Sequence, residues 1–153
     1  MVDTIHIELV SQEKKVFEET GATMILIPAV EGIMGVLPNH APTIAALGYG
    51  ELIVRKGNAE ERFLVFGGVV DVRPGKVVVL ADLAASSHDI DIEAAERARA
   101  NAEKLLREGL PPEANRDATL ALRKANLELQ ISRNMRQRAP VMRILGEDEK
   151  VQQ

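Results

Sequence analysis

The chain has 153 residues and a formal net charge of -4, and 46% of its residues are hydrophobic while only 3% are aromatic. This length suits one domain, or one domain with a small appendage, around a core of Val, Ile, Leu and Ala. The negative charge argues against nucleic acid as a partner. The absence of cysteine excludes disulfides, thiolate metal sites and a cysteine nucleophile.

The first segment alternates apolar and polar residues. Ile5, Ile7 and Leu9 point to one side, and His6 and Glu8 point to the other, which predicts a half-buried strand. No apolar run here or later approaches the roughly 18 residues of a membrane-spanning helix, so we expect no direct membrane insertion.

Four more β-branched runs follow, and turn signals separate them. The letters "KGN" at 56–58 and "RPGK" at 73–76 each suit a hairpin. The runs read TMILIP, ELIVRK, RFLVFGGVVDV and KVVVLADL. Short strands joined by hairpins predict an antiparallel β-sandwich or barrel over residues 1–85.

Two features of this β-rich part favour structural over catalytic roles. Pro38 and Pro42 flank His40 in "PNHAP" and predict a rigid turn, because each proline restricts its own φ and the residue before it. His40 has no sequence neighbour that suits catalysis or metal binding. The pair Gly67–Gly68 precedes no helical pattern, so we interpret it as a bulge or a close backbone approach rather than a phosphate loop.

Residues 86–139 are rich in Ala, Glu, Arg and Leu, and their apolar period is that of a helix. Ser87 or Asp89 is expected to cap the first helix, and Gly109 is expected to end it. A second helix follows after a short Gly-Pro turn, so the two helices form an antiparallel hairpin.

The second helix is expected to begin at Pro112 or Glu113 and to end at or before Ala139, because Pro140 follows. Residues 140–153 are predicted as a separate, acidic tail.

The facing positions of this hairpin are mostly alanine. An alanine in place of a leucine lowers the favourable free energy of burial by roughly 2 kcal/mol, at about 0.8 kcal/mol per methylene. A hairpin packed this weakly is able to detach or extend, which permits a conformational switch. The expected seam comprises Ala95, Ala98, Ala102, Leu105, Ala118, Ala121, Leu122, Ala125 and Leu129.

Sequence motifs of catalysis are missing. The chain contains no phosphate-binding loop, no zinc-protease motif and no nucleophile elbow. It also has no acid and base paired at a recognisable spacing. We therefore expect no enzyme activity, no cofactor and no metal ion.

Basic residues gather toward the end of the second helix. Arg133, Arg136 and Arg138 follow one another with no acidic residue between them, and Arg123 and Lys124 precede them. One interpretation is a solvated helix end, which the helix dipole favours. The other is a docking surface for an acidic partner, because guanidinium groups pair with carboxylates.

Several motifs together resemble the epsilon subunit of bacterial and chloroplast F-type ATP synthases. They are VSQEKKVFE, EGIMGVLPNHAP, FGGVVDVRPGKVVVLAD and the helical hairpin, and they cover residues 4 to about 135. The resemblance implies an α+β fold, with an N-terminal β-sandwich of about ten strands before the two helices. It also implies a non-catalytic subunit of the rotor stalk, peripheral to the cytoplasmic face of the bacterial plasma membrane.

The same resemblance implies partners. The sandwich is expected to bind the gamma subunit and to rest on the c-ring, coupling proton-driven rotation to the catalytic head. The helices of family members can extend along gamma to acidic segments of the catalytic beta subunits, which inhibits ATP hydrolysis and would give the arginines a partner. The sequence leaves open whether this helix pair extends or stays folded beside the sandwich. The c-ring contact falls on Glu31, Gly32 and Ile33, where many relatives carry an acid at the position of Ile33. The turn at 38–42 is implied to lie close to the rotor.

Some members of the family bind ATP through an Ile/Leu-Asp-x-x-Arg-Ala motif and basic residues on the second helix. Here Ile90 and Asp91 match, Ala94 replaces the arginine, and Lys124 and Glu128 occupy the basic positions. The glutamate reverses a charge and would repel phosphates. We therefore expect weak or absent ATP binding.

Two other functions compete with a stalk subunit. One is an ATP-sensing module whose hairpin folds around the nucleotide, and the missing arginine at Ala94 counts against it. The other is a small enzyme with a β-barrel pocket, and the lack of an acid–base pair counts against it.

Overall fold

The structure is a computed structural model that describes residues 1–145. These residues form two compact units, one of residues 1–88 together with 139–145 and one of residues 89–138. The elements are β1 (Ile5–Ser11), β2 (Lys15–Ala22), β3 (Met24–Ala29), β4 (Gly32–Val36), β5 (Thr43–Ala46), β6 (Tyr49–Lys56), β7 (Ala59–Val72), β8 (Lys76–Ser86), the short 3-10 helix η1 (Ser87–Asp89), α1 (Ile92–Arg107) and α2 (Pro112–Gln137).

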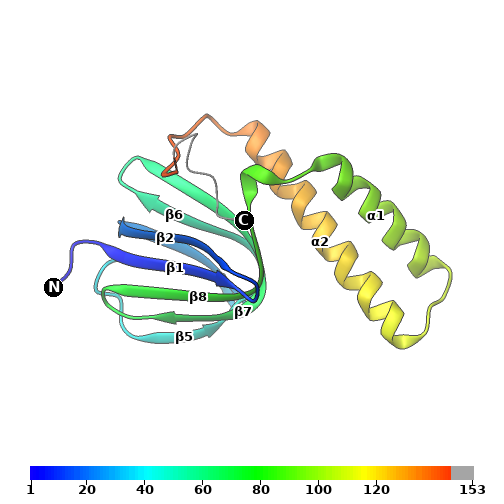
Figure 1. Cartoon of the computed structure of the whole chain (residues 1–153), viewed down its shortest axis with the longest axis horizontal. Coiled ribbons are helices and arrows are strands. Elements are labelled where there is room, and N and C mark those ends of the chain that lie inside the picture. Colours follow the sequence, from blue (N-terminus) through cyan, green and yellow to red (C-terminus); the bar gives the residue numbers. More distant parts are fainter. Residues whose placement is uncertain (146–153) are drawn as a thin grey trace. The chain divides into compact units, whose positions relative to one another are not determined.

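The strands of the first unit follow the order β2-β1-β8-β7-β6-β3-β4, and β5 also pairs with β7. Figure 1 shows β1 between β2 and β8. Neighbouring strands run antiparallel except β1 and β8, which are parallel. The α+β prediction of a sandwich followed by two helices is confirmed. The described residues form eight strands where about ten were expected, because the long β7 pairs with β6 over its first half and with β5 over its second.

The core of the sandwich follows the alternation seen in the sequence. Ile5, Ile7 and Leu9 are fully buried, as predicted. They share one apolar cluster with Phe17 and Phe63, whose ring centroids are 4.8 Å apart. Burial of each large apolar side chain contributes about 1.5–3 kcal/mol to the free energy of folding. The aliphatic residues can therefore stabilise the core although the chain has few aromatic rings.

Gly67 and Gly68 allow β7 to change the face that it turns to the core. Both have positive φ, 65° and 120°. A Cβ on Gly68 would lie 2.1 Å from the carbonyl oxygen of Leu80, so the predicted close backbone approach is confirmed. The core positions of β7 are odd before this pair and even after it: Phe63 and Val65, then Val70 and Val72.

The "PNHAP" segment begins with a tight turn, as predicted. The His40 amide donates to the Leu37 carbonyl at 3.1 Å, and Asn39 has φ 69°. Pro38 followed by a residue of positive φ is the arrangement of a type II turn. The Asn39 side chain also pairs with the backbone of Val2, accepting from its amide at 3.0 Å and donating to its carbonyl at 2.9 Å.

The first helix starts later than expected. Ser87 and Asp89 belong to η1, and α1 is capped instead by Asp91, whose carboxylate accepts from the Ala94 amide at 3.1 Å. The cap prediction was therefore wrong, because the short 3-10 turn was not visible in the sequence. Gly109 ends this helix region with φ 73°, as expected.

The helix seam is narrower than the sequence suggested. Ala98 and Ala121 are exposed, so their inclusion was wrong. The buried alanines repeat every seven residues, which keeps one line of small side chains between the helices. The buried seam residues are Ala95, Ala102, Ala118, Ala125 and Leu129, with Leu105 and Leu122 half-buried.

Neither α1 nor α2 combines the length and the apolar character that a bilayer crossing needs. Residues 146–153 of the predicted tail lie outside the described residues.

Candidate functional site

Two neighbouring segments of the sandwich expose large apolar side chains. Val30 in the turn between β3 and β4, Ile33 on β4 and Ile44 on β5 are 67%, 79% and 76% exposed, and they line one groove. We call these three residues the apolar patch. A group of large exposed aliphatic side chains is typical of a surface that another molecule covers.

Backbone contacts hold the apolar patch together. The Val30 amide donates to the Ala46 carbonyl at 3.0 Å, which fixes the turn against the end of β5. Gly32 adopts φ 137°, a conformation that favours glycine. The predicted contact residues Glu31, Gly32 and Ile33 thus lie at this surface, and all three are exposed.

Sequence reasoning missed two of the three patch residues. Val30 and Ile44 look like ordinary strand-end residues, and backbone contacts such as the pairing of Ala29 with Leu47 bring β5 beside the turn. The available signal was an apolar residue directly beside a turn, which is weak because single exposed aliphatic residues are common.

His40 has no catalytic geometry. Its Nδ1 lies 2.7 Å from the Ala41 carbonyl oxygen, so the ring is engaged with its own turn. Pro38 and Pro42 bracket it on the surface of the sandwich. The residue that sequence reasoning missed is Asn39, which ties the turn to the start of the chain.

The residues that correspond to the family's ATP-binding motif make contacts within the hairpin itself. Asp91 caps the Ala94 amide, and the Lys124 ammonium lies 3.8 Å from the Glu128 carboxylate. Burial raises the pKa of Glu128, Lys124 lowers it, and the charge of Asp91 raises it further. The Asp91 charge therefore acts on the Glu128 carboxylate, and weak or absent ATP binding stays a prediction.

The five predicted docking cations separate along the hairpin. Arg133 and Arg136 lie one turn apart and line a small hollow between the helices. Arg123 and Lys124 lie about 14 Å earlier, at about 1.5 Å of rise per residue. Arg138 is the first residue beyond α2.

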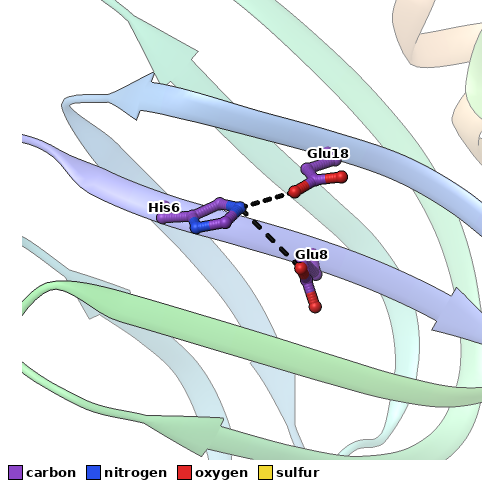
Figure 2. Close-up of side chains that lie close together, drawn as sticks. All are labelled: His6, Glu8 and Glu18. Atoms are coloured by element: carbon purple, nitrogen blue, oxygen red, sulfur yellow. Dashed lines mark hydrogen bonds and ion pairs between the residues drawn. The ribbon is translucent and has the colours of Figure 1, made fainter.

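A polar network lies on the outer face of β1 and β2. Figure 2 shows His6 between two carboxylates, with its Nε2 2.8 Å from Glu18 and 3.8 Å from Glu8. Lys15 lies 2.8 Å from Glu18, and Lys15 and Lys76 lie 3.8 Å and 3.9 Å from Glu8. The spacing of the imidazole and carboxylates would suit a metal ion. The two ammonium groups already balance the carboxylates, so we interpret the group as an ion-pair network.

This network predicts an unusually acidic glutamate. Hydrogen bonds from Lys15 and then His6 lower the pKa of Glu18 from 4.5 to about 2. A lowered folded-state pKa gives stability that is present above pH 4.5 and is lost as the pH falls toward 2. NMR titration of the side-chain carboxyl carbon should place the Glu18 midpoint near 2. In Lys15→Ala the midpoint should move back toward 4.5, and an unchanged midpoint would contradict this assignment.

The comparisons with known proteins agree on one family. Residues 4–87 match the model of the ATP synthase delta/epsilon chain β-sandwich domain. An ATP synthase epsilon chain of Alkalilimnicola ehrlichii is 39% identical over 139 residues, which cover 90% of this chain and 99% of that one. An epsilon chain of Halalkalibacterium halodurans is 36% identical, covering 84% and 97% of the two chains.

Solved structures also match most of the chain. A chain in the Euglena gracilis mitochondrial ATP synthase, solved as OSCP, F1 and c-ring, matches with a TM-score of 0.66 and 25% identity over 89% of this chain and 81% of that one. A chain of the Tetrahymena thermophila enzyme shares the fold with a TM-score of 0.59. The chain described here therefore belongs to the ATP synthase delta/epsilon family, as a non-catalytic central-stalk subunit of the F-type ATP synthase.

Proposed function

We propose that the sandwich couples c-ring rotation to the catalytic head by binding the gamma subunit and the c-ring, and that the hairpin restrains ATP hydrolysis. In this proposal the chain sits peripherally at the cytoplasmic face of a bacterial plasma membrane. The helices act by extending toward the catalytic beta subunits. No substrate or nucleotide is bound by the chain itself.

The observation that supports the coupling role is the apolar patch. Its three aliphatic side chains line the same groove as the exposed Glu31, so a c-ring loop would meet one acidic group beside an apolar surface. Such a contact buries apolar area while leaving the charge at the rim, which is how ordinary protein interfaces are built. The turn at 38–42 is proposed as a rigid neighbour of this contact.

The observation that supports the restraining role is the weak seam together with the exposed arginines. Four of the buried residues between the helices are alanines, so separating the helices exposes less apolar area than a leucine seam would. Arg133 and Arg136 are exposed near the end of α2, where extension would carry them furthest from the sandwich. Guanidinium groups in that position suit acidic segments.

Replacing the hairpin tests the restraint. We expect the assembled enzyme to hydrolyse ATP about fivefold faster or more, the usual size of an allosteric coupling, when residues 90–138 are replaced by a flexible Gly-Ser linker. The linker keeps residues 139–145, which pack on the sandwich. Steady-state hydrolysis by the reconstituted complex is the measurement.

A matched pair of variants locates the effect. Arg133→Ala with Arg136→Ala should raise hydrolysis, whereas Arg107→Ala with Arg116→Ala, also exposed on the hairpin, should leave it unchanged. Equal rates for the linker chain and the parent chain would contradict the restraint. Failure of the linker chain to assemble would also contradict it, because the helices would then serve assembly.

A further inference from the structure

The segment that follows α2 returns to the sandwich and pairs with the start of β7. The Glu60 amide donates to the Met142 carbonyl at 2.8 Å, and the Ile144 amide donates to the Glu60 carbonyl at 3.4 Å. Arg143 and Glu60 form a parallel bridge. We call residues 141–145 the strap.

The strap covers an acidic residue that faces the core. On β7, Glu61 lies on the same face as Phe63 and Val65, and it stands opposite Val54 of β6. Phe63, Val65 and Val54 are core residues, and Glu61 is itself 0% exposed. A carboxylate in a row of apolar residues needs a charged partner, because an unpaired buried charge is costly.

Arg143 supplies that partner. Its Nε and Nη2 donate to the two carboxylate oxygens of Glu61 at 2.8 and 2.9 Å, and the Leu145 amide donates to Oε1 at 3.3 Å. Ile144 and Leu145 also pack against the core cluster. The two-point guanidinium contact is the strongest geometry for such a pair, so the strap is docked by charge, backbone pairing and apolar contact together.

The strap tethers the C-terminal end of α2 to the sandwich. The chain leaves the sandwich after His88, and the strap begins four residues after the last residue of α2, Gln137. With Arg143 held, the chain reaches at most about 3.5 Å per residue, so the end of α2 stays within roughly 20 Å of Glu61. Arg133 and Arg136 are confined with it.

We propose that the Glu61–Arg143 pair is a latch that keeps the end of α2 tethered to the sandwich, and that the strap must leave the sandwich before α2 can extend. This inference rests on the proposed restraining role of the hairpin. It assigns the start of β7 as a docking site for the chain's own residues 141–145. The latch breaks as a unit, because departure of Arg143 leaves Glu61 without its ion-pair partner and uncovers the core beneath Ile144 and Leu145.

Spin labels test the latch in the full chain. The chain has no cysteine, so Glu13→Cys on the sandwich and Arg107→Cys on the hairpin can be labelled selectively. Electron–electron distance measurements on this labelled parent should give a distribution that ends at the reach of the tether. Adding Arg143→Ala should increase the population beyond that limit about tenfold or more, since it removes a charge-assisted hydrogen-bonded pair.

Three further variants keep the test decisive if Arg143→Ala weakens folding. A chain ending at Ala139 removes the strap and opens Glu61 to water, and it should show the same new distances. Arg143→Lys keeps the charge without the two-point contact and should give a smaller change. Arg73→Ala, an exposed arginine elsewhere on the sandwich, should give none. An unchanged distance distribution in both the Arg143→Ala and the shortened chain would overturn the latch.

The rates of ATP hydrolysis by the linker chain and by Arg143→Ala distinguish failure of the latch from failure of the proposed restraining role. If both hold, Arg143→Ala should slow hydrolysis severalfold, while the linker chain speeds it. If the linker chain leaves hydrolysis unchanged, the restraining role fails, and the spin-label distances still decide whether the latch holds the hairpin. If the linker chain speeds hydrolysis while Arg143→Ala changes neither distances nor rate, the latch fails alone.

Discussion

Gly68→Ala is expected to destabilise the sandwich by more than about 3 kcal/mol, because an L-residue at this φ costs about 1–3 kcal/mol and steric overlap adds to it. The glycine has φ 120°, and the added Cβ would lie 2.1 Å from the Leu80 carbonyl oxygen and 2.8 Å from the Ala81 Cα. Both of these atoms belong to backbone, so no side chain can turn aside. β7 and β8 would have to separate where they cross from one half of the sandwich to the other.

Gly32→Ala is the matched control for this substitution. Its φ of 137° is similarly unfavourable for alanine, but nothing lies within 4 Å of the added Cβ. The difference between the two variants therefore isolates the steric overlap from the conformational cost. Urea unfolding followed by circular dichroism gives both free energies, and equal values for the two variants would show that the strands can move apart freely.

Ile33→Lys and Ile44→Lys are expected to weaken association of the stalk with the c-ring about tenfold or more each, the effect of losing an interface anchor. Both side chains are exposed, so stability of the isolated chain should change little. At Ile33 the lysine would carry the charge opposite to that of the acid found there in many relatives, and at Ile44 its ammonium would have to be desolvated in an apolar contact. Co-purification with the c-ring and ATP-driven proton pumping are the measurements, and pumping should fall while hydrolysis continues.

Ile33→Asp is the control at the same position. The family resemblance places an acid here in many relatives, so this variant should keep both association and pumping. If lysine and aspartate behave alike, with both tolerated, the apolar patch is not the c-ring contact. Loss of pumping in the aspartate variant alone would also contradict the proposed surface, because it would reverse the expected preference for an acid.

The local pattern of the sequence was sufficient for most of the fold. Alternation places Ile5, Ile7 and Leu9 in the core, and Gly and Pro mark the turns at 56–58 and 73–76. These features are local because strand period and turn conformation depend on a few adjacent residues. The helix seam was only partly predicted, since Ala98 satisfies the helical period yet lies outside the narrow line of contact.

Some residues of the candidate sites could also be identified from the sequence, and others only from the structure. The turn containing Glu31 and Ile33 could be identified from its motif, but Ile44 joins them only because β5 folds back beside that turn. Asn39 was passed over in favour of its neighbour His40, although the asparagine makes the long-range hydrogen bonds. Residue type drew attention to the histidine, whereas the contact across 37 residues could be seen only in the structure.

By itself, the sequence determined a β-rich first part, a two-helix second part, the lack of catalytic motifs and the resemblance to a stalk subunit, because composition, period and motif are carried by neighbouring residues. Tertiary structure alone decided that Glu61 faces the core and that Arg143, 82 residues later, neutralises it. In the sequence each is one charged residue among many. Burial and pairing are properties of two segments brought together, so the strap and its latch emerged only when the chain was folded.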